Sequence, residues 1–306
     1  MRYGGRYRGI EPVCDTGPTG TREPEDHGDL YTGGGAVPGS AEPGDRAGDG
    51  DMKYRPLIRY YGGKSRISGW VLSHFPKHRV YTEAFGGAAS CLLRKERSYA
   101  EIYNDLNGEL VNLFRVVRDN GEELLRKIKL TPFSRQEMLE AYDHSIDPVE
   151  QARRTIVKAN MGHGSDSLYR QNGFRGSVNR AGSTPSHDWA SYPSALARII
   201  ERFQGVVIES MEAVGVLEKY DSPDTLHYVD PPYLAETRQA RHGYVHELTD
   251  LDHCAMSEVL HKLRGGVVLS GYPSPLYEDL YKGWRRVERE SFAYCAKKRT
   301  EVLWIK

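Results

Sequence analysis

The chain has 306 residues, which is long enough for one large domain that carries an insert. Of these residues 39% are hydrophobic and 27% are charged, a composition typical of a globular protein. No run approaches the roughly 18 consecutive apolar residues of a membrane helix, and the N-terminus lacks the apolar core of a secretory signal. The four cysteines lie far apart, and none forms the Cys-x-x-Cys pair of a zinc knuckle. We therefore expect a cytoplasmic protein with no metal site and no membrane partner.

The net charge of zero conceals an uneven distribution along the chain. Residues 1–51 carry five basic and ten acidic side chains, so residues 52–306 have 37 basic and 32 acidic side chains, a net charge of about +5. A positive balance of this size permits contact with phosphate groups. The first 51 residues are rich in Gly and Pro and have almost no aliphatic periodicity, so they cannot bury enough apolar surface to offset the ordering entropy. We expect this tail to be disordered.

Beyond the tail, β-rich runs alternate with amphipathic helical patterns, which predicts a mostly parallel α/β sheet. Strands are predicted at 79–83, 99–103, 206–209, 226–229 and 266–270, with a closing hairpin at 287–294 and 300–305. Helices are predicted from about residue 90, across 106–117 and at 249–263. We place the catalytic domain in two parts, 52–107 and 205–306.

Between the two parts, residues 108–204 follow a different pattern. Helical stretches come first, and a polar, glycine-containing segment runs over residues 162–186. A loop of this length inside a compact domain is usually functional, so we interpret residues 108–204 as a target-recognition insert. Arginine can pair with guanine through two hydrogen bonds, which makes the side chains of this segment candidates for contact with a base or a phosphate. The candidates are Arg170, Asn172, Arg175, Asn179 and Arg180.

The tetrapeptide Asp230-Pro231-Pro232-Tyr233 directly follows the predicted strand 226–229. Ligands of parallel sheets bind beyond the carboxyl ends of the strands, so this is where chemistry is expected. A carboxylate and the Pro231 carbonyl can accept hydrogen bonds from an exocyclic amine of a base and aim its lone pair at a methyl donor. The two prolines hold the turn rigid, and Tyr233 offers a stacking face for a base taken out of the duplex.

A glycine-rich turn, Glu83-Ala84-Phe85-Gly86-Gly87, follows the first predicted strand and lets the backbone approach a ligand closely. Asp105 lies eighteen residues after Gly87, at the end of the next strand. There it either accepts hydrogen bonds from two ribose hydroxyls or caps the following helix. An earlier loop contains Tyr60 and Lys64, which we expect to close over the same ligand.

In this order, the Lys64 loop, the Phe85-Gly86-Gly87 turn, Asn104-Asp105-Leu106-Asn107 and the tetrapeptide at 230–233 resemble the Dam-like DNA adenine methyltransferase family, with later motifs most similar to its phage and prophage members. The resemblance implies a Rossmann-like, S-adenosylmethionine-dependent methyltransferase fold with an inserted, mainly helical target-recognition region. It also implies double-stranded DNA as the partner and a flipped adenine as the target. We expect no protein partner.

By this resemblance, cofactor would bind at Tyr60, Lys64, Glu83, Phe85, Gly86, Gly87 and Asp105, and catalysis would use Asp230, Pro231, Pro232 and Tyr233. The family often has Trp where Tyr60 stands, Pro where Ala84 stands and Gly where Ala89 stands. Two alternatives remain open at this point. One is methylation of the cytosine N4 amine by the same geometry, and the other is a DNA-binding relative that no longer catalyses.

Overall fold

The computed structural model describes residues 55–178, 182–238, 245–292 and 298–306. The chain divides into two parts, 1–50 and 51–306, and every described residue belongs to the second part. The predicted disorder of residues 1–51 and the predicted DNA contacts of Asn179 and Arg180 therefore lie outside the described residues. None of the described helices is long and apolar enough to cross a membrane.

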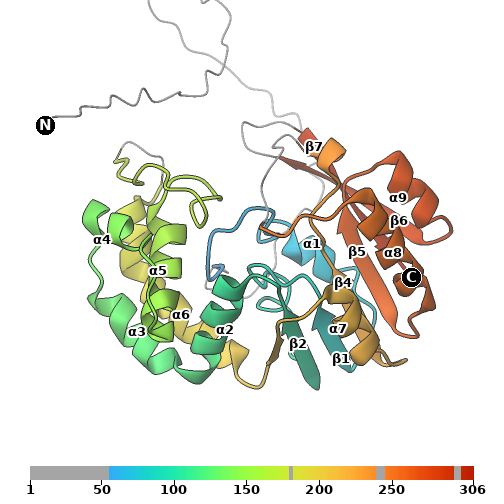
Figure 1. The fold of residues 1–306 in the computed structure, drawn as a ribbon, viewed down its shortest axis with the longest axis horizontal. Helices are drawn as coiled ribbons and strands as arrows, with labels where there is room; N and C mark the ends of the chain where they lie inside the picture. The colour runs from blue at the N-terminus through green and yellow to red at the C-terminus, as the bar shows by residue number, and fades with distance from the viewer. Residues whose placement is uncertain (1–54, 179–181, 239–244, 293–297) are drawn as a thin grey trace, which may run out of the picture. The chain divides into compact units, whose positions relative to one another are not determined.

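Seven strands of the described chain form one sheet in the order β3-β2-β1-β4-β5-β7-β6. Their bounds are β1 Val80–Glu83, β2 Ala100–Asn104, β3 Val207–Glu209, β4 Thr225–Val229, β5 Gly266–Gly271, β6 Arg285–Phe292 and β7 Lys298–Ile305. The first five strands pair in parallel, whereas β7 is antiparallel to both β5 and β6 (Figure 1). The order 3-2-1-4-5 is that of doubly wound, Rossmann-like sheets. The predicted fold class and the closing hairpin are confirmed.

The helices begin where the sequence supplies capping side chains. Asn107, Asp147, Thr184 and Thr249 each accept a hydrogen bond from a backbone N–H in the first turn of the helix that follows. The described helices are α1 Ser68–Leu72, α2 Gly108–Asp119, α3 Gly121–Leu130, α4 Arg135–Glu140, α5 Pro148–Met161, α6 Pro185–Phe203, α7 Ala213–Lys219, α8 Asp250–Lys262 and α9 Pro275–Leu280. A short 3₁₀ helix, η1, covers Ala235–Thr237.

Two hydrophobic clusters cover opposite faces of the sheet. Tyr228 and Val268 belong to one cluster, while their neighbours along the strands, Val229 and Leu269, belong to the other. Successive strand side chains point to opposite faces, so this alternation places a cluster on each side. Helices α1 to α6 contribute to the first cluster, and α7, α8 and α9 contribute to the second.

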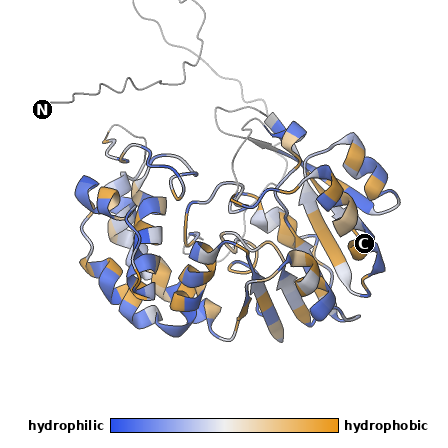
Figure 2. Cartoon of the chain, in the orientation of Figure 1, coloured by the Kyte–Doolittle hydropathy of each residue, from blue (hydrophilic) through white to orange (hydrophobic). Residues whose placement is uncertain are grey.

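The helical region α2 to α6 packs directly onto the sheet. Helix α2 contacts α5, α6 and strand β3. The centre of the Phe114 ring in α2 lies 4.4 Å from the centre of the Tyr103 ring in β2 and 4.7 Å from that of the Phe203 ring in α6. Hydrophobic and hydrophilic residues alternate around these helices in Figure 2, as expected of helices with one buried stripe. The region therefore shares the hydrophobic core of the sheet and has no separate core.

The helix predicted from about residue 90 is wrong. Residues 90–94 form hydrogen-bonded turns. The backbone N–H of Leu92 donates to the Glu83 carboxylate at 2.6 Å, which removes it from a helical hydrogen-bond ladder. Ala89 has a left-handed backbone with φ +52°, and Gly87 has φ +49°. These two reversals turn the chain tightly after β1, and a regular helix cannot begin there.

Candidate active site

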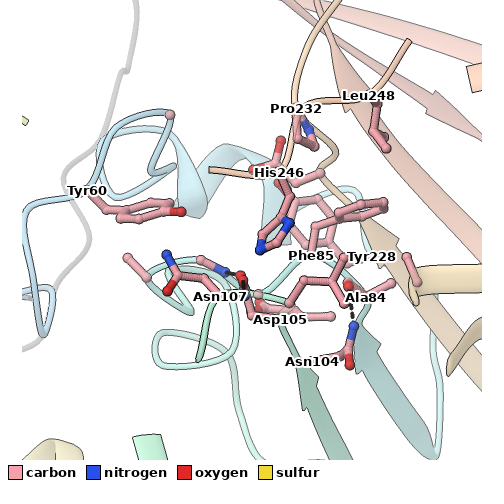
Figure 3. A pocket seen from close by; sticks show the side chains of 18 of the residues that line it. Tyr60, Ala84, Phe85, Asn104, Asp105, Asn107, Tyr228, Pro232, His246 and Leu248 are labelled. Carbon is pink, nitrogen blue, oxygen red and sulfur yellow. Dashed lines mark hydrogen bonds between the residues drawn. The ribbon is translucent and has the colours of Figure 1, made fainter. Parts of the chain in front are cut away.

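A cavity of about 240 Å³ lies at the carboxyl ends of β1, β2 and β4. This is just below the range of small-molecule sites, about 300 to 1,000 Å³. Residues from six stretches line it: the loop at 60–64, the turn at 83–91, the residues 104–107 after β2, residues 212–214 at the start of α7, residues 228–232 at the end of β4, and the segment 245–256. Figure 3 shows Tyr60, Asp105, Asn107 and His246 gathered around the same space. The sheet thus brings together the sequence motifs that were predicted to share a ligand.

Asp230 lies directly after β4 and lines this cavity. Its Oδ1 atom accepts a hydrogen bond of 2.7 Å from the Ser270 hydroxyl at the end of β5. The same oxygen lies 2.7 Å from Lys64 Nζ, in an ion pair whose side chains are 7% (Lys64) and 16% (Asp230) exposed. Asp230 is therefore held at the cavity by two neighbours, and it presents a carboxylate where a substrate amine can reach it.

Tyr233 is placed differently from the expectation of an open stacking face. Its side chain is buried, it does not line the cavity, and its hydroxyl donates to Glu301 Oε2 at 3.0 Å. The Lys64 ammonium lies 4.5 Å from the centre of the Tyr233 ring, and the Tyr272 ring packs edge-on at 4.7 Å. A base can stack on this ring only after Lys64 moves. Pro232 lines the cavity, whereas Pro231 does not.

Glu301 was missed by the sequence reasoning. It is 8% exposed, and burial raises the pKa of its carboxyl above the ordinary value. Val302 pairs with Gly271 at the end of β5, so the preceding residue of the antiparallel β7 lies at the edge where the parallel strands end. The signal was available in principle, because Glu301 is the one acid directly before the apolar run 302–305 of a predicted closing strand.

Glu83, the last residue of β1, is a buried carboxyl group with a side chain only 2% exposed. Its Oε1 atom accepts hydrogen bonds from the Tyr81 hydroxyl at 2.8 Å and from the Leu92 amide at 2.6 Å. Burial raises the pKa of Glu83 to about 7, against the opposing effect of these two hydrogen bonds. Near neutral pH this group exchanges easily between its charged and neutral forms, and a nearby cation would keep it charged.

Asp105 fixes the glycine-rich turn against the end of β2. Its two carboxylate oxygens accept hydrogen bonds of 2.8 Å, one from the Gly87 amide and one from the Asn107 amide. Burial raises its pKa in spite of these bonds. The alternative that Asp105 caps the following helix is wrong, since Asn107 caps α2 by accepting from Glu109 N at 2.9 Å. Asp105 therefore faces the cavity with its remaining acceptor capacity.

Gly86 is required by close packing against the next strand. A Cβ atom at this position would lie 2.2 Å from the Tyr103 ring. The backbone N–H of Gly86 also donates to the Asn104 carbonyl at 2.7 Å, which fastens the turn to β2. Only glycine allows this approach, and the approach forms one wall of the cavity.

The sequence model of the D12 class N6 adenine-specific DNA methyltransferases matches residues 60–294. The chain belongs to this family. Its members methylate the N6 amine of adenine in DNA, and membership implies S-adenosylmethionine as the methyl donor. The matched residues include the cavity lining and the helices between β2 and β3.

Three methyltransferases are similar to this adenine methyltransferase over most of its length. The Type II methyltransferase M1.LlaDCHI of Lactococcus lactis subsp. cremoris is 29% identical over 76% of this chain and 86% of its own length. The DNA adenine methylase of Haemophilus influenzae is 23% identical, covering 82% of this chain and 92% of its own. The DNA adenine methylase of Serratia marcescens is 23% identical, covering 75% and 88%.

The three predicted DNA contacts of the methyltransferase that lie among the described residues differ in their surroundings. Arg170 is exposed. Asn172 instead donates to the His163 carbonyl at 2.9 Å and to Asp166 Oδ1 at 2.8 Å. Arg175 donates to the Asn160 carbonyl at 2.8 Å, and its side chain is only 15% exposed. These two side chains hold the segment between α5 and α6 together, so the expectation that they read DNA is not supported by their contacts.

Two histidines differ in their placement. His246 lines the cavity. His253 is fully buried in α8, where its Nδ1 lies 3.0 Å from the Tyr277 hydroxyl. The sequence pattern of a helix histidine favours packing, and His253 follows it. His246 has no such pattern, and only the fold brings it to the cavity.

Proposed function

We propose that the cavity binds S-adenosylmethionine and that Asp230 orients the N6 amine of a flipped adenine of double-stranded DNA beside it. The observation that carries this is the position of Asp230, because its carboxylate lines the same cavity as Glu83 and Asp105. The lining also matches the chemistry of the cofactor, which has an ammonium group, a carboxylate, two ribose hydroxyls and a purine. Asp105 is available for the hydroxyls, Glu83 for the cation and Phe85 for the purine.

The amine of adenine is a weak nucleophile because its lone pair is delocalised into the ring. Hydrogen bonds accepted from it by Asp230 and by the Pro231 carbonyl would favour a tetrahedral nitrogen and direct its lone pair. S-adenosylmethionine supplies an electrophilic methyl group when bound. Asp230 need not remove a proton beforehand, since the amine becomes acidic only after it receives the methyl group.

Lys64 gives this proposal a specific consequence. Its ammonium contacts Asp230 Oδ1 at 2.7 Å and lies 4.5 Å from the centre of the Tyr233 ring. An amine that donates to Asp230 while its base stacks on Tyr233 needs the same position. The Lys64 ammonium therefore neutralises Asp230 until the base arrives, and the incoming adenine displaces it.

We assign target recognition to the helical region and in particular to the segment between α5 and α6. Arg170 is the exposed cation of that segment among the described residues that were predicted to contact DNA. Contacts of this kind position a duplex through its phosphates or read guanine in the major groove. The reaction would take place in the cytoplasm, where duplex DNA of a prokaryotic or phage-infected cell is accessible.

The test is methyl transfer from labelled S-adenosylmethionine to a PCR-amplified duplex, with the product base identified by mass spectrometry. We expect N6-methyladenine from the wild type and a loss of about 10²-fold or more in Asp230→Asn, because a charged acceptor is replaced. Asp221→Asn is the matched control, since Asp221 precedes the other end of β4 and binds the Arg264 and Gly265 amides. Equal activity in Asp230→Asn, or label in cytosine, would overturn the assignment.

A further inference from the structure

One side chain of the segment between α5 and α6 reaches the cavity residues. The hydroxyl of Tyr169 accepts a hydrogen bond of 2.7 Å from Asn107 Nδ2 and donates one of 3.4 Å to the Tyr60 hydroxyl. The rings of Tyr169 and Tyr60 meet edge to face, with 6.5 Å between their centres. Both partners of Tyr169 line the cavity, whereas Tyr169 itself does not.

These two partners contact Asp105 and the Gly87 turn that binds it, which together form the proposed ribose site. The backbone N–H of Asn107 donates to Asp105 Oδ1 at 2.8 Å. The Tyr60 ring lies over Gly87, where an added Cβ would come within 3.0 Å of the ring. Burial raises the pKa of Tyr169 to about 12, so its hydroxyl keeps its proton at neutral pH and continues to donate. Tyr169 thus fixes the positions of both walls beside Asp105.

The same turn of the segment faces outward at the next residue. The backbone amides of Tyr169 and Arg170 both donate to the Asp166 carbonyl, at 3.0 and 3.1 Å, so one hydrogen-bonded turn holds the two residues. Arg170 is exposed, and its carbonyl accepts a hydrogen bond of 2.9 Å from the Tyr142 hydroxyl. A contact made by Arg170 can therefore reach Asn107 and Tyr60 through one short turn of backbone.

We propose that Tyr169 is a positioning residue that couples the binding of DNA by the segment between α5 and α6 to the binding of cofactor in the cavity. This inference rests on the proposed function. A displacement of the turn by DNA changes the hydrogen bonds of Tyr169 and with them the two walls beside Asp105. Linkage requires the effect to be reciprocal, so bound cofactor also changes the affinity for DNA by the same factor.

The first measurement compares the binding of S-adenosylhomocysteine, the demethylated product, by calorimetry without DNA. Tyr169→Phe removes one hydroxyl and two hydrogen bonds, so we expect binding about 2- to 10-fold weaker than in the wild type. Tyr142→Phe is the matched control, because its hydroxyl donates to the Ser167 and Arg170 carbonyls of the same segment and touches no cavity residue. We expect less than a 2-fold change there. Melting temperatures establish that both variants are folded.

The second measurement repeats the titration with a short duplex that carries a site mapped in the transfer assay. The ratio of the dissociation constants without and with DNA is the coupling factor. We expect about 5-fold or more in the wild type and in Tyr142→Phe, and a factor near 1 in Tyr169→Phe. A wild-type factor of 1, an unchanged factor in Tyr169→Phe, or an equal loss in Tyr142→Phe overturns the inference. A wild type that binds no S-adenosylhomocysteine refutes the proposed cofactor site instead.

Discussion

Replacing Glu83 by Gln should stabilise the folded protein and weaken its proposed cofactor site. The side chain is buried, and both of its hydrogen bonds end on Oε1, so a glutamine oxygen can accept them from Tyr81 and Leu92. What the substitution removes is the cost of a buried negative charge. That cost is expressed in the pKa of Glu83, which burial raises from 4.5 to about 7.

The size and sign of the effect follow from proton linkage. The folded protein binds the Glu83 proton more tightly than the unfolded chain, so the stability that this group contributes below pH 4.5 is lost as the pH rises to about 7. A difference of about 2.5 pKa units corresponds to about 3 kcal/mol. Glutamine does not titrate, so Glu83→Gln should exceed the wild type by up to this amount at pH 8 and by much less at pH 5.

The assay is thermal unfolding of both proteins at pH 5 and pH 8, together with S-adenosylmethionine binding. At about 2 to 4 °C per kcal/mol, we expect a melting temperature roughly 6 to 12 °C higher for Glu83→Gln at pH 8. Cofactor affinity should fall about 10-fold or more, because the ammonium group of the cofactor loses its buried carboxylate partner. The stabilised variant is thus expected to be the less active one.

Glu101→Gln is a control with the opposite sign. Glu101 is also buried, but it accepts hydrogen bonds of 2.6 Å from both Lys95 and Arg202. Burial alone would raise the pKa of Glu101, and these bonds outweigh it and lower the pKa. Its ionised form is therefore stabilising at pH 8, and Glu101→Gln should melt at a lower temperature. If Glu83→Gln melts no higher than the wild type at pH 8, or if its advantage is the same at pH 5, the reasoning is refuted.

Four further substitutions test the turn after β1 and the recognition segment. Ala89→Val should lower the free energy of unfolding by about 2 kcal/mol or more, because β-branched residues tolerate the observed φ of +52° poorly; denaturant unfolding checks this, and a neutral effect would contradict it. Gly86→Ala should cost about 1 to 3 kcal/mol through its clash with Tyr103, and wild-type melting would argue against that packing. Arg170→Ala should weaken DNA binding in gel-shift titrations without changing the melting temperature. Arg175→Ala should lower the melting temperature and leave DNA binding unchanged. The opposite pattern would show that Arg175 binds DNA and that Arg170 stabilises the segment.

The chemistry-bearing end of the sheet was predictable from short stretches of sequence. The carboxyl ends of parallel strands lie at one edge of the sheet, so Glu83, Asp105 and Asp230, at or just after the ends of β1, β2 and β4, could be assigned to one site in advance. The turn after β1 was partly misjudged. Small residues at 86–89 predicted a close approach of the backbone. They did not predict the left-handed conformation of Ala89, because alanine gives no local signal for it.

The sequence by itself determined the order of the strands along the chain, the fold class and the family, because these follow from local periodicity and from motifs read in chain order. Only the tertiary structure decided which side chains meet. Lys64 contacts Asp230, Tyr233 contacts Glu301, and Asn107 contacts Tyr169 across long separations in sequence. The physical reason is that such contacts depend on strand register and on the packing of whole elements. Neither leaves a pattern in the neighbouring residues.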